Sequence, residues 1–302
     1  MTDVPAAPAR PDPSLTLGVT RFNNPRVHIQ SWYFAMPSRA LRRFEAKTLD
    51  ALNRSIVFFR GNDYRVRALD ARCPHLGADL GMGTVDHNAI RCPFHGWTFD
   101  GDGVCVGHKE VAVAYPVEER YGAIWFFNGP KALFELPEIE LPVVTMLKEQ
   151  LVACHPHLIA SNGLDVDHFN TLHSIAMLEK PLLDQPDAFR TRLRMRVAFA
   201  MWKNVDVTFT TIGGNLATID AMLGNMPLSV LFSHRLHGRF SVSRTFVFVR
   251  SRIHLPLALY AVAKIVKGDR ELLDRIVFRA NLQETDAPLA AFIRQVNEMS
   301  VF

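Results

Sequence analysis

The segment Cys73-Pro74-His75-Leu76-Gly77, followed after a glycine-containing stretch by Cys92-Pro93-Phe94-His95-Gly96-Trp97, decides how this chain is interpreted. It contains two Cys/His pairs separated by 16 residues. Two thiolates and two imidazoles can bind one zinc ion tetrahedrally. The same donors can hold a [2Fe–2S] cluster, with two Cys on one iron and two His on the other. The spacing by itself leaves both metal sites open.

The size and composition of the chain indicate a soluble globular protein. With 302 residues, we expect two domains of ordinary size. Hydrophobic residues make up 48% and charged residues 21%, which excludes a disordered chain. A net charge of +4 is too weak for a nucleic-acid-binding surface. The densest basic group, Arg39, Arg42, Arg43 and Lys47, is either a solvated face or a docking surface for an acidic redox partner.

The ends and apolar runs of the chain predict no membrane span. Residues 1–25 form a proline-rich stretch that we interpret as a flexible tail without a secretion signal. The longest apolar run, Leu255 to Val266, has 12 residues and contains Pro256, whereas a spanning helix needs about 20. Four cysteines in a chain without a secretion signal favour a reducing, cytoplasmic environment.

The first part of the chain reads as a small β domain. Short strands broken by glycine and Asx turns are predicted at Ser55 to Arg60, Tyr64 to Leu69, Ala89 to Arg91, Trp97 to Phe99 and Gly122 to Phe127. Turn-forming and proline-containing pairs follow, so we place a domain boundary near residue 140.

The second part of the chain has mixed α+β character. A helical stretch follows Asn162, alternating strands are predicted at Val205 to Thr210 and Ser241 to Val249, and a closing helix begins at Asp269.

The residues around the two Cys/His pairs, Cys-Pro-His-x-Gly and Cys-Pro-x-His-Gly-Trp, resemble the two metal-binding loops of the Rieske iron–sulfur family. The resemblance implies that Cys73, His75, Cys92 and His95 hold a [2Fe–2S] cluster. Glycine and proline suit the tight loops that such a site needs. Cys105 and Cys154 lie outside the motif and are expected to be small buried side chains.

A second constellation, Asn162-Gly-Leu-Asp165-Val-Asp-His168-Phe-Asn-Thr-Leu-His173, has two histidines five residues apart, preceded by a carboxylate. Two imidazoles and one carboxylate, with open positions left over, suit Fe(II) in oxygen chemistry. Five residues of α-helix rotate by about 140°, so the two histidines do not share a face of a regular helix. We therefore predict a π-bulge or a break between them.

The pattern Asn-x-x-Asp-x-x-His-x-x-x-x-His downstream of a Rieske motif resembles the signature of the Rieske oxygenase family, over residues 26 to 302. This implies that His168 and His173 bind the catalytic iron and that Asp165 bridges it to the cluster. Asp165 lies one helical turn before His168, within reach of its imidazole. Asp167 is expected at the surface, and Ser161 stands where the family usually has Glu.

The resemblance also implies a third iron ligand, an aspartate on a late helix, and Asp269, Asp274 and Asp286 are candidates. Stepping 100° per residue places Asp269 within an apolar stripe that runs from Leu272 to Ala280, whereas Asp274 lies off it. An iron would offset the cost of burying a carboxylate there. The alternative for Asp269 is a helix N-cap. We expect Asp269 to be the ligand, with Asp274 next.

The fold that the resemblance implies is α+β: a Rieske [2Fe–2S] β domain over residues 26–140, then a helix-grip (START-like) catalytic domain over 141–302, with an antiparallel sheet around a long helix. It also implies a mononuclear Fe(II), O2 as co-substrate and a homotrimer. No G-x-G-x-x-G fingerprint is present, so electrons from NAD(P)H are expected to arrive through a separate reductase and ferredoxin.

The function predicted on this basis is a terminal oxygenase that hydroxylates, dihydroxylates or demethylates a small, largely apolar organic molecule. The alternative is an electron carrier, which would need only the first ~130 residues. The substrate pocket is expected between Thr191 and Arg252. Met201, Phe209, Met222 and Met226 are candidates for its lining or for plain core.

Overall fold

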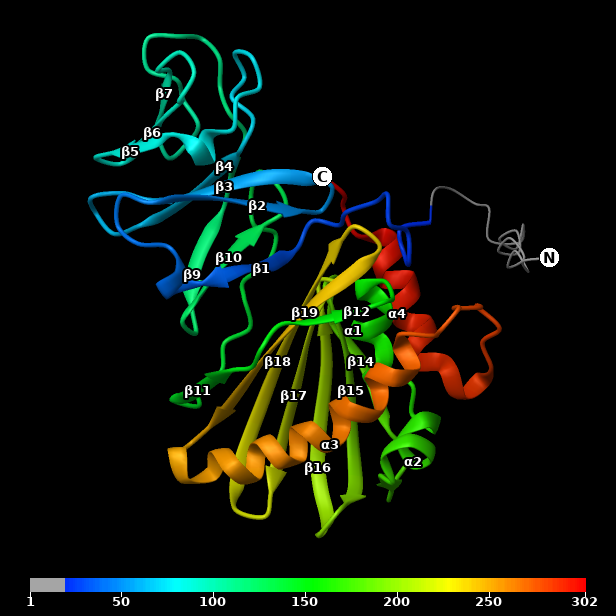
Figure 1. Cartoon of the computed structure of the whole chain (residues 1–302). Helices are drawn as coiled ribbons and strands as arrows, with labels where there is room; N and C mark the ends of the chain where they lie inside the picture. The colour runs from blue at the N-terminus through cyan, green and yellow to red at the C-terminus, as the bar shows by residue number, and fades with distance from the viewer. Residues whose placement is uncertain (1–19) are drawn as a thin grey trace, which may run out of the picture.

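The computed structural model describes residues 20–302, so the tail predicted for residues 1–25 lies largely outside the described residues. Figure 1 shows an upper lobe of small sheets and a lower lobe built on one large sheet. Neighbouring strands are antiparallel in both lobes. The predicted α+β fold, a β-rich N-terminal part followed by an antiparallel sheet packed against a long helix, is therefore confirmed.

The upper lobe contains three short sheets. In sheet order their strands are β1 (Trp32–Pro37), β10 (Ala123–Phe127) and β9 (Val117–Arg120); β2 (Ala46–Ala51), β3 (Arg54–Arg60), β4 (Val66–Asp70) and β8 (Ala114–Tyr115); and β5 (Thr84–Asp86), β6 (Ala89–Arg91) and β7 (Thr98–Phe99). The five strands predicted in this region correspond to β3, β4, β6, β7 and β10, with ends shifted by no more than two residues.

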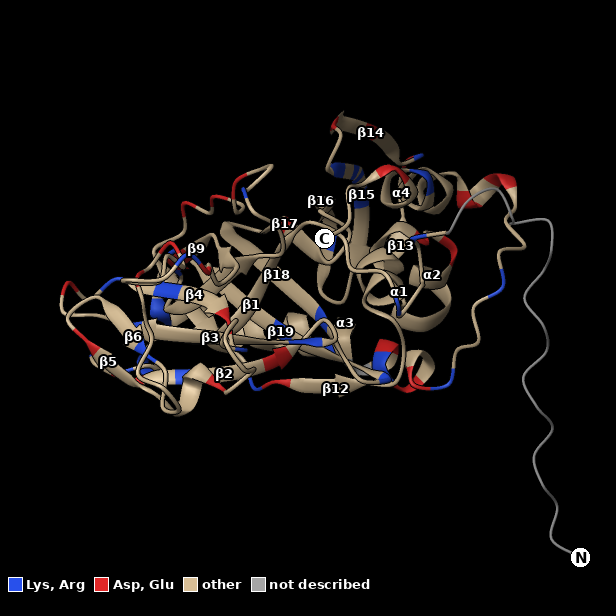
Figure 2. Ribbon diagram, turned by 90° about the horizontal axis from the view of Figure 1, so that it is seen from above, with Lys and Arg blue, Asp and Glu red and all other residues tan. Residues whose placement is uncertain are grey.

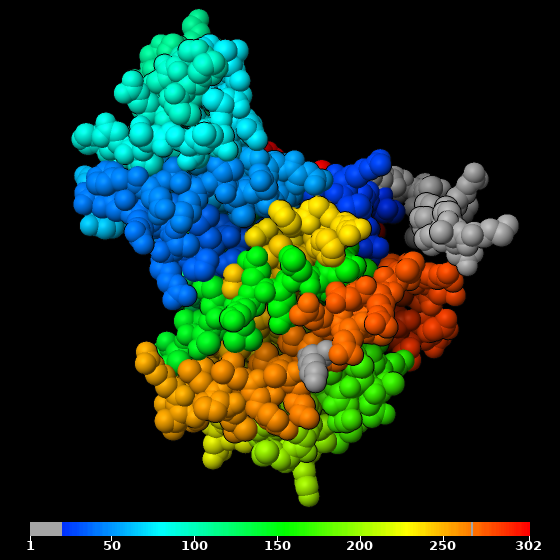
Figure 3. All heavy atoms as spheres, viewed as in Figure 1, coloured from blue at the N-terminus to red at the C-terminus, as the bar shows by residue number. Residues whose placement is uncertain are grey.

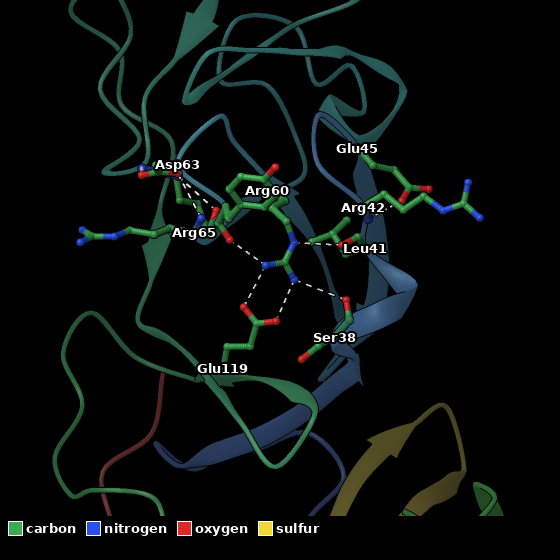
Figure 4. A network of polar contacts seen from close by, with 10 residues as sticks. Ser38, Leu41, Arg42, Glu45, Arg60, Asp63, Arg65 and Glu119 are labelled. Atoms are coloured by element: carbon green, nitrogen blue, oxygen red, sulfur yellow. Dashed lines mark hydrogen bonds and ion pairs between the residues drawn. The ribbon is translucent and has the colours of Figure 1, made fainter.

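An ion pair between buried Arg60 and half-exposed Glu119 joins two of these sheets. Arg60 of β3 donates hydrogen bonds to both carboxylate oxygens of Glu119 of β9, at 2.9 Å each, and to the main-chain oxygen of Leu41 (Figure 4). The Arg60 guanidinium holds the pKa of Glu119 below its usual value. Because the Glu119 side chain is 37% exposed, solvent screens this pair and its contribution to stability is small.

The lower lobe is organised by a nine-stranded sheet. Along its main path the strands are β11 (Val143–Met146), β19 (Phe240–Val249), β18 (Met226–His237), β17 (Leu216–Leu223), β16 (Trp202–Ile212), β15 (Arg190–Phe199) and β13 (Ala176–Met177), while β12 (Gln150–Val152) pairs with β19 and β14 (Leu182–Asp187) pairs with β15. On β15, four arginines alternate with buried residues from Thr191 to Phe199, as expected for a strand with one covered face.

Four α-helices accompany the large sheet within residues 20–302: α1 (Pro156–Ser161), α2 (Asp167–His173), α3 (Leu255–Leu273) and α4 (Ala287–Glu298). The predicted closing helix was placed wrongly, because α3 begins at Leu255 and ends soon after Asp269. Pro256 was read as an interruption, but it lies in the first turn, where proline costs no hydrogen bond.

The two faces of the large sheet have different neighbours. One face packs on the upper lobe, where Trp125 of β10 and Phe34 of β1 contact Phe246 of β19. The other face is crossed by α3, drawn in orange in Figures 1 and 3. The predicted boundary near residue 140 falls in the irregular connection between β10 and β11 and stays a prediction.

Candidate metal centres and cavity

The two Cys/His loops have the same backbone turn. The N–H of Gly77 donates to the oxygen of Cys73 at 2.8 Å, and the N–H of Gly96 donates to the oxygen of Cys92 at 3.2 Å. Both glycines have a positive φ, +76° and +74°, which favours glycine over other residues. The two loops therefore present their side chains in a matched way.

The four donor side chains of these loops are arranged by depth. Cys73 and Cys92 are buried, whereas His75 and His95 are exposed, with ring centroids 4.5 Å apart. Trp97 stacks on His75 at 4.3 Å and orients its ring. Sulfur donors thus lie inside and nitrogen donors at the surface.

These loops fit a two-metal cluster better than a single ion. A tetrahedral zinc would hold four ligand atoms about 2.0–2.3 Å from itself. Within residues 20–302, no three donors of the two loops come within 4.8 Å of one another. Burial raises the pKa of the Cys73 thiol, while the N–H groups of His75 and Leu76 lower it by donating to its sulfur. Such donors also suit a thiolate bound to metal.

The remaining cysteines behave as predicted. Cys105 and Cys154 are buried, and burial raises the pKa of both thiols, that of Cys154 to about 12. Neither thiol has the character of a reactive or ligating cysteine.

In the lower lobe, His168, His173 and Asp269 come together. Their ligand atoms all lie within 4.8 Å of one another. Asp269 Oδ1 is 2.6 Å from His173 Nε2 and 3.8 Å from His168 Nε2. The side chains are 10%, 1% and 15% exposed, in chain order. Two imidazoles and one carboxylate on one side leave other coordination positions of a metal open. Their role as iron ligands stays a proposal.

The predicted irregularity between the histidines is wrong. Helix α2 runs without interruption from Asp167 to His173, and the two rings still converge, with centroids 5.2 Å apart. The irregular backbone lies outside the pair: a 3-10 turn, Asn162–Leu164, precedes α2, and Ser174 is left-handed. Each imidazole extends beyond the helix surface and rotates about two bonds, so rings about 140° apart can still meet beside a short helix.

The backbone sets the orientation of His168. Its Nδ1 atom lies 2.5 Å from the main-chain oxygen of Asp165, so the proton belongs on Nδ1 and the lone pair on Nε2. The Asp165 carboxylate lies 3.9 Å from Nδ1, and its side chain is 42% exposed. Asn162 approaches Nε2 at 3.5 Å. This arrangement prepares Nε2 for a metal, as a hydrogen bond on the other ring nitrogen commonly does.

The other candidate carboxylates have different surroundings. Asp274 accepts a hydrogen bond from the N–H of Ala153, and Asp286 takes part in a capping box with Gln283 at the start of the 3-10 turn Glu284–Asp286, which precedes α4. Asp167 is exposed, as predicted. Buried Ser161 donates to the oxygen of Leu158.

Asp269 lies beside both histidines, but the apolar stripe from which it was chosen in the sequence does not exist. The supposed stripe extends past the end of α3, and Val277 within it is 80% exposed. The N-cap alternative is wrong too, because Asp269 lies near the end of α3. The feature that the sequence argument missed is Gly268: a Cβ there would lie 3.2 Å from Leu172 Cγ and 3.5 Å from His173 Cε1. Glycine inside a helix is the signal for such a close approach.

An apolar cavity adjoins Asp269. It has about 1330 Å³ of space, including a part open to solvent, between the large sheet, α3 and the segment around Asn162. Phe209 lines it, as predicted, and Gly163 packs against the Phe209 ring. Met226 is buried in the surrounding core. Met201 and Met222 are 69% and 47% exposed, so placing them in the pocket or the core was wrong. The lining also reaches beyond Thr191 to Arg252, to Ile265 on α3.

Basic and acidic residues are interspersed along the ribbon in the view of Figure 2. Of the basic group, Arg39, Arg42 and Arg43 are exposed, and Lys47 lies 3.2 Å from Glu45. Its use in docking stays a prediction. Among residues 20–302, no helix is long and apolar enough to cross a membrane.

Comparison with known proteins identifies the domain that contains the two Cys/His loops. Residues 31–116 match the family model of the Rieske [2Fe-2S] domain. The chain is 35% identical over 169 residues to cholesterol 7-desaturase of Bombyx mori, covering 51% of this chain and 37% of that protein. It is 36% identical over 141 residues to the oxygenase subunit of 3-chlorobenzoate-3,4-dioxygenase of Comamonas testosteroni, covering 40% and 32%. These matches span about a third of the relatives' lengths.

A solved structure extends the similarity of fold to most of the chain. The crystal structure of dicamba monooxygenase bound to dicamba superposes with a TM-score of 0.68 at 18% identity, over 88% of this chain and 96% of that one. The lower lobe, and not only the Rieske domain, thus has the fold of such an enzyme.

Proposed function

We propose, from the premise that this chain belongs to the Rieske oxygenase family, that it is the terminal oxygenase of a multi-protein system. It takes up electrons at the upper lobe and uses O2 to oxidise a small, largely apolar organic molecule in the lower lobe. The observation that carries the proposal is the grouping of His168, His173 and Asp269 beside an apolar cavity. An electron carrier has no use for either feature.

The residues that hold the cofactors follow from the two sites. Cys73, Cys92, His75 and His95 hold the [2Fe–2S] cluster, and His168, His173 and Asp269 hold the mononuclear iron. When bound, the cluster supplies single electrons and the iron supplies positions for O2.

The chain's own residues prepare this chemistry. The main-chain oxygen of Asp165 keeps the proton of His168 on Nδ1 and leaves Nε2 free for the metal. The Asp269 carboxylate adds a negative charge that partly balances a dication. The apolar lining excludes bulk water and holds the substrate by burial of apolar surface.

The electron path and the assembly are part of the proposal. Asp165 links the iron to the exposed histidines of a neighbouring subunit's cluster in a homotrimer. Electrons originate from NAD(P)H and come through a separate reductase and ferredoxin, in the cytoplasm. The chain divides into a Rieske part, residues 26–140, and a catalytic part, residues 141–302.

The lining of the cavity indicates the class of substrate that it binds. The two relatives are named for cholesterol and for 3-chlorobenzoate, so their names point to different substrates. The mostly aliphatic and aromatic lining favours an apolar molecule, which the enzyme hydroxylates, dihydroxylates or demethylates.

Metal content and isotope labelling test the proposal. The purified protein should contain three irons and two acid-labile sulfides per chain. The enzyme is reduced chemically and supplied with 18O2. A compound that binds in the cavity as substrate should then gain labelled oxygen or lose a methyl group. Cholesterol and 3-chlorobenzoate are the first compounds to try. His168→Ala should keep the cluster spectrum but lose one iron and all turnover, whereas Asp167→Asn should keep both.

Two outcomes would contradict the proposal. Two irons per chain in the parent protein would make it an electron carrier. Normal oxidation by His168→Ala would place the chemistry elsewhere.

A further inference from the structure

One wall of the cavity carries a row of polar side chains, Gln150, Ser243 and His234, called the polar row below. Gln150 of β12 is opposite Ser243 of β19, and Ser243 is opposite His234 of β18. Residues opposite each other in antiparallel strands point to the same face of the sheet, so the three side chains lie side by side. Farther along β18 the same wall is apolar, at Val230 and Leu228.

His234 is buried without a hydrogen-bond partner for its ring. The residue is 2% exposed, and its Nδ1 has no partner within residues 20–302. Burial lowers the pKa of His234 to about 3, so the imidazole is neutral at physiological pH. An unpaired buried polar group costs about 1–3 kcal/mol. Because His234 lines the cavity and none of the hydrogen bonds found within residues 20–302 involves its ring, the imidazole is available to a ligand there.

The surroundings of the polar row favour an uncharged ligand group. Arg235 and Arg244 follow His234 and Ser243 in the chain and therefore point to the opposite face of the sheet. There the Arg244 guanidinium lies 4.8 Å from the Phe34 ring centroid. Arg270, which does border the cavity, is 51% exposed and lies 3.7 Å from Asp274. Among the residues whose side chains the structure describes, Arg270 is the one cation that lines the cavity, and it lies beside Asp274.

The polar row is separated from the metal site by several strands. Helix α2 with His168 and His173 contacts β13, which pairs with β15. His234 lies on β18, three strands away from β15. Neighbouring strands are about 4.8 Å apart, so three steps place β18 about 14 Å from β15, which is about the length of a polycyclic molecule.

We infer that Gln150, Ser243 and His234 bind an uncharged oxygen, a hydroxyl or a ketone, at one end of an apolar polycyclic substrate. The opposite end of the molecule lies beside His168, His173 and Asp269. A neutral imidazole donates from one nitrogen and accepts at the other, so it can pair with either kind of oxygen. The orientation of the substrate rests on the proposed function, whereas the oxygen site rests on the cavity alone.

Binding of a matched series of tricyclic probes tests the inference. 2-Hydroxyfluorene, 9-fluorenone, fluorene and fluorene-2-carboxylate are titrated into the holoenzyme under anaerobic conditions without an electron donor, and probe fluorescence or calorimetry reports binding. We expect the two uncharged oxygen compounds to bind about 10-fold more tightly than fluorene, as one hydrogen bond to an unpaired group allows. The carboxylate should bind no better than fluorene.

Variants assign the preference to the polar row. His234→Phe should abolish it while leaving fluorene binding intact, and Ser243→Ala should reduce it. His237→Phe, on the same strand but exposed, should keep it. His234→Phe should also unfold at an equal or higher temperature, because it removes an unpaired buried nitrogen. Should that variant not fold, Gln150→Leu combined with Ser243→Ala provides the same comparison.

Three results would overturn the inference: an unchanged preference in His234→Phe, tighter binding of the carboxylate, or no binding of any probe. A loss of stability in His234→Phe with unchanged preference would give His234 a structural role only. Since binding is measured without turnover, a preference without any oxidation would leave the oxygen site standing and count against the proposed function. Oxidation of a substrate without a preference for the uncharged oxygen compounds would support the proposed function and count against the oxygen site.

Discussion

The Nδ1 atom of His168 lies 2.5 Å from the main-chain oxygen of Asp165, while the carboxylate of the same aspartate lies 3.9 Å away. The backbone therefore orients the imidazole, and the half-exposed carboxylate is left free to contact a group outside this chain. This division of tasks separates holding the iron from linking it to a cluster.

Asp165→Asn should accordingly keep the iron, because the main-chain contact to His168 is unchanged. Loss of the negative charge should slow electron transfer by about 10- to 100-fold, as is typical for residues that support metal ligands. Single-turnover kinetics with a pre-reduced cluster and ferrous iron measure this as cluster reoxidation. Reoxidation at the parent rate would refute the bridge, and loss of iron would make Asp165 a ligand.

Asp269→Ala should lose the mononuclear iron and all turnover, since it removes the one carboxylate within 4.8 Å of both imidazoles. Asp274→Ala is the matched control, five residues on. It removes a hydrogen bond to Ala153 and should lower stability by about 1 kcal/mol while keeping the iron. Measuring the iron content of both variants tests this prediction. Loss of iron from Asp274→Ala but not from Asp269→Ala would make Asp274 the ligand.

Gly268→Val should weaken iron binding without unfolding the protein. A Cβ at this position already meets Leu172 and His173 at 3.2 and 3.5 Å, so two more methyl groups must push α2 and α3 apart. Ala263→Val, on an exposed position of the same helix, controls for the lower helix propensity of valine. Iron titration of the metal-free proteins checks the result; equal affinities in both variants would show that the close approach has no role in binding.

Cys92→Ser should remove the visible spectrum of the cluster and its labile sulfide while leaving the mononuclear iron in place. Cys105→Ser changes another buried cysteine of the same lobe and should keep the cluster. Absorption spectra together with sulfide analysis distinguish the two. Loss of the cluster from Cys105→Ser alone would contradict the assignment of ligands.

Acid should destabilise the fold partly through His155. Burial lowers the pKa of His155 to about 4 from an ordinary 6.5. Between pH 4 and pH 6.5 the unfolded chain binds more protons at this residue than the folded protein does. The contribution of neutral His155 to the free energy of unfolding is therefore complete above pH 6.5 and is lost as the pH falls towards 4. At pH 5 the loss relative to pH 7.5 is about 2 kcal/mol.

His155→Asn keeps a favourable N-cap for α1 but removes the titration. Urea unfolding at pH 7.5 and pH 5 should therefore show a loss about 2 kcal/mol smaller in the variant than in the parent. His237→Asn, at an exposed site, should lose as much as the parent. Equal losses in His155→Asn and the parent would mean that other groups carry the acid sensitivity.

The Cys/His donors and the His168/His173 pair could be proposed from the sequence because they reside in short contiguous motifs. Cys73 to Trp97 contains two short loops and Asn162 to His173 is one short segment. Within each of them the donors are only a few residues apart, so their spacing indicates the kind of site. The strands of the upper lobe were also located well, because glycine and Asx residues mark their ends.

The third carboxylate was harder to predict because its position depends on how α3 packs on α2. That contact depends on Gly268, which the sequence argument missed. The polar row was missed for a related reason: Gln150, His234 and Ser243 come from three strands, and only the strand register brings them together.

The aromatic contacts between the lobes fix the span between the two metal sites of one chain. Trp125, Phe34 and Phe246 would be exposed if the lobes swung apart. At 150–250 Å² of buried area for each aromatic side chain, that opening costs on the order of 10 kcal/mol. The protein therefore does not gate electron flow by a hinge motion between the lobes. Timing has to come from the docking of the electron donor or from events inside the cavity.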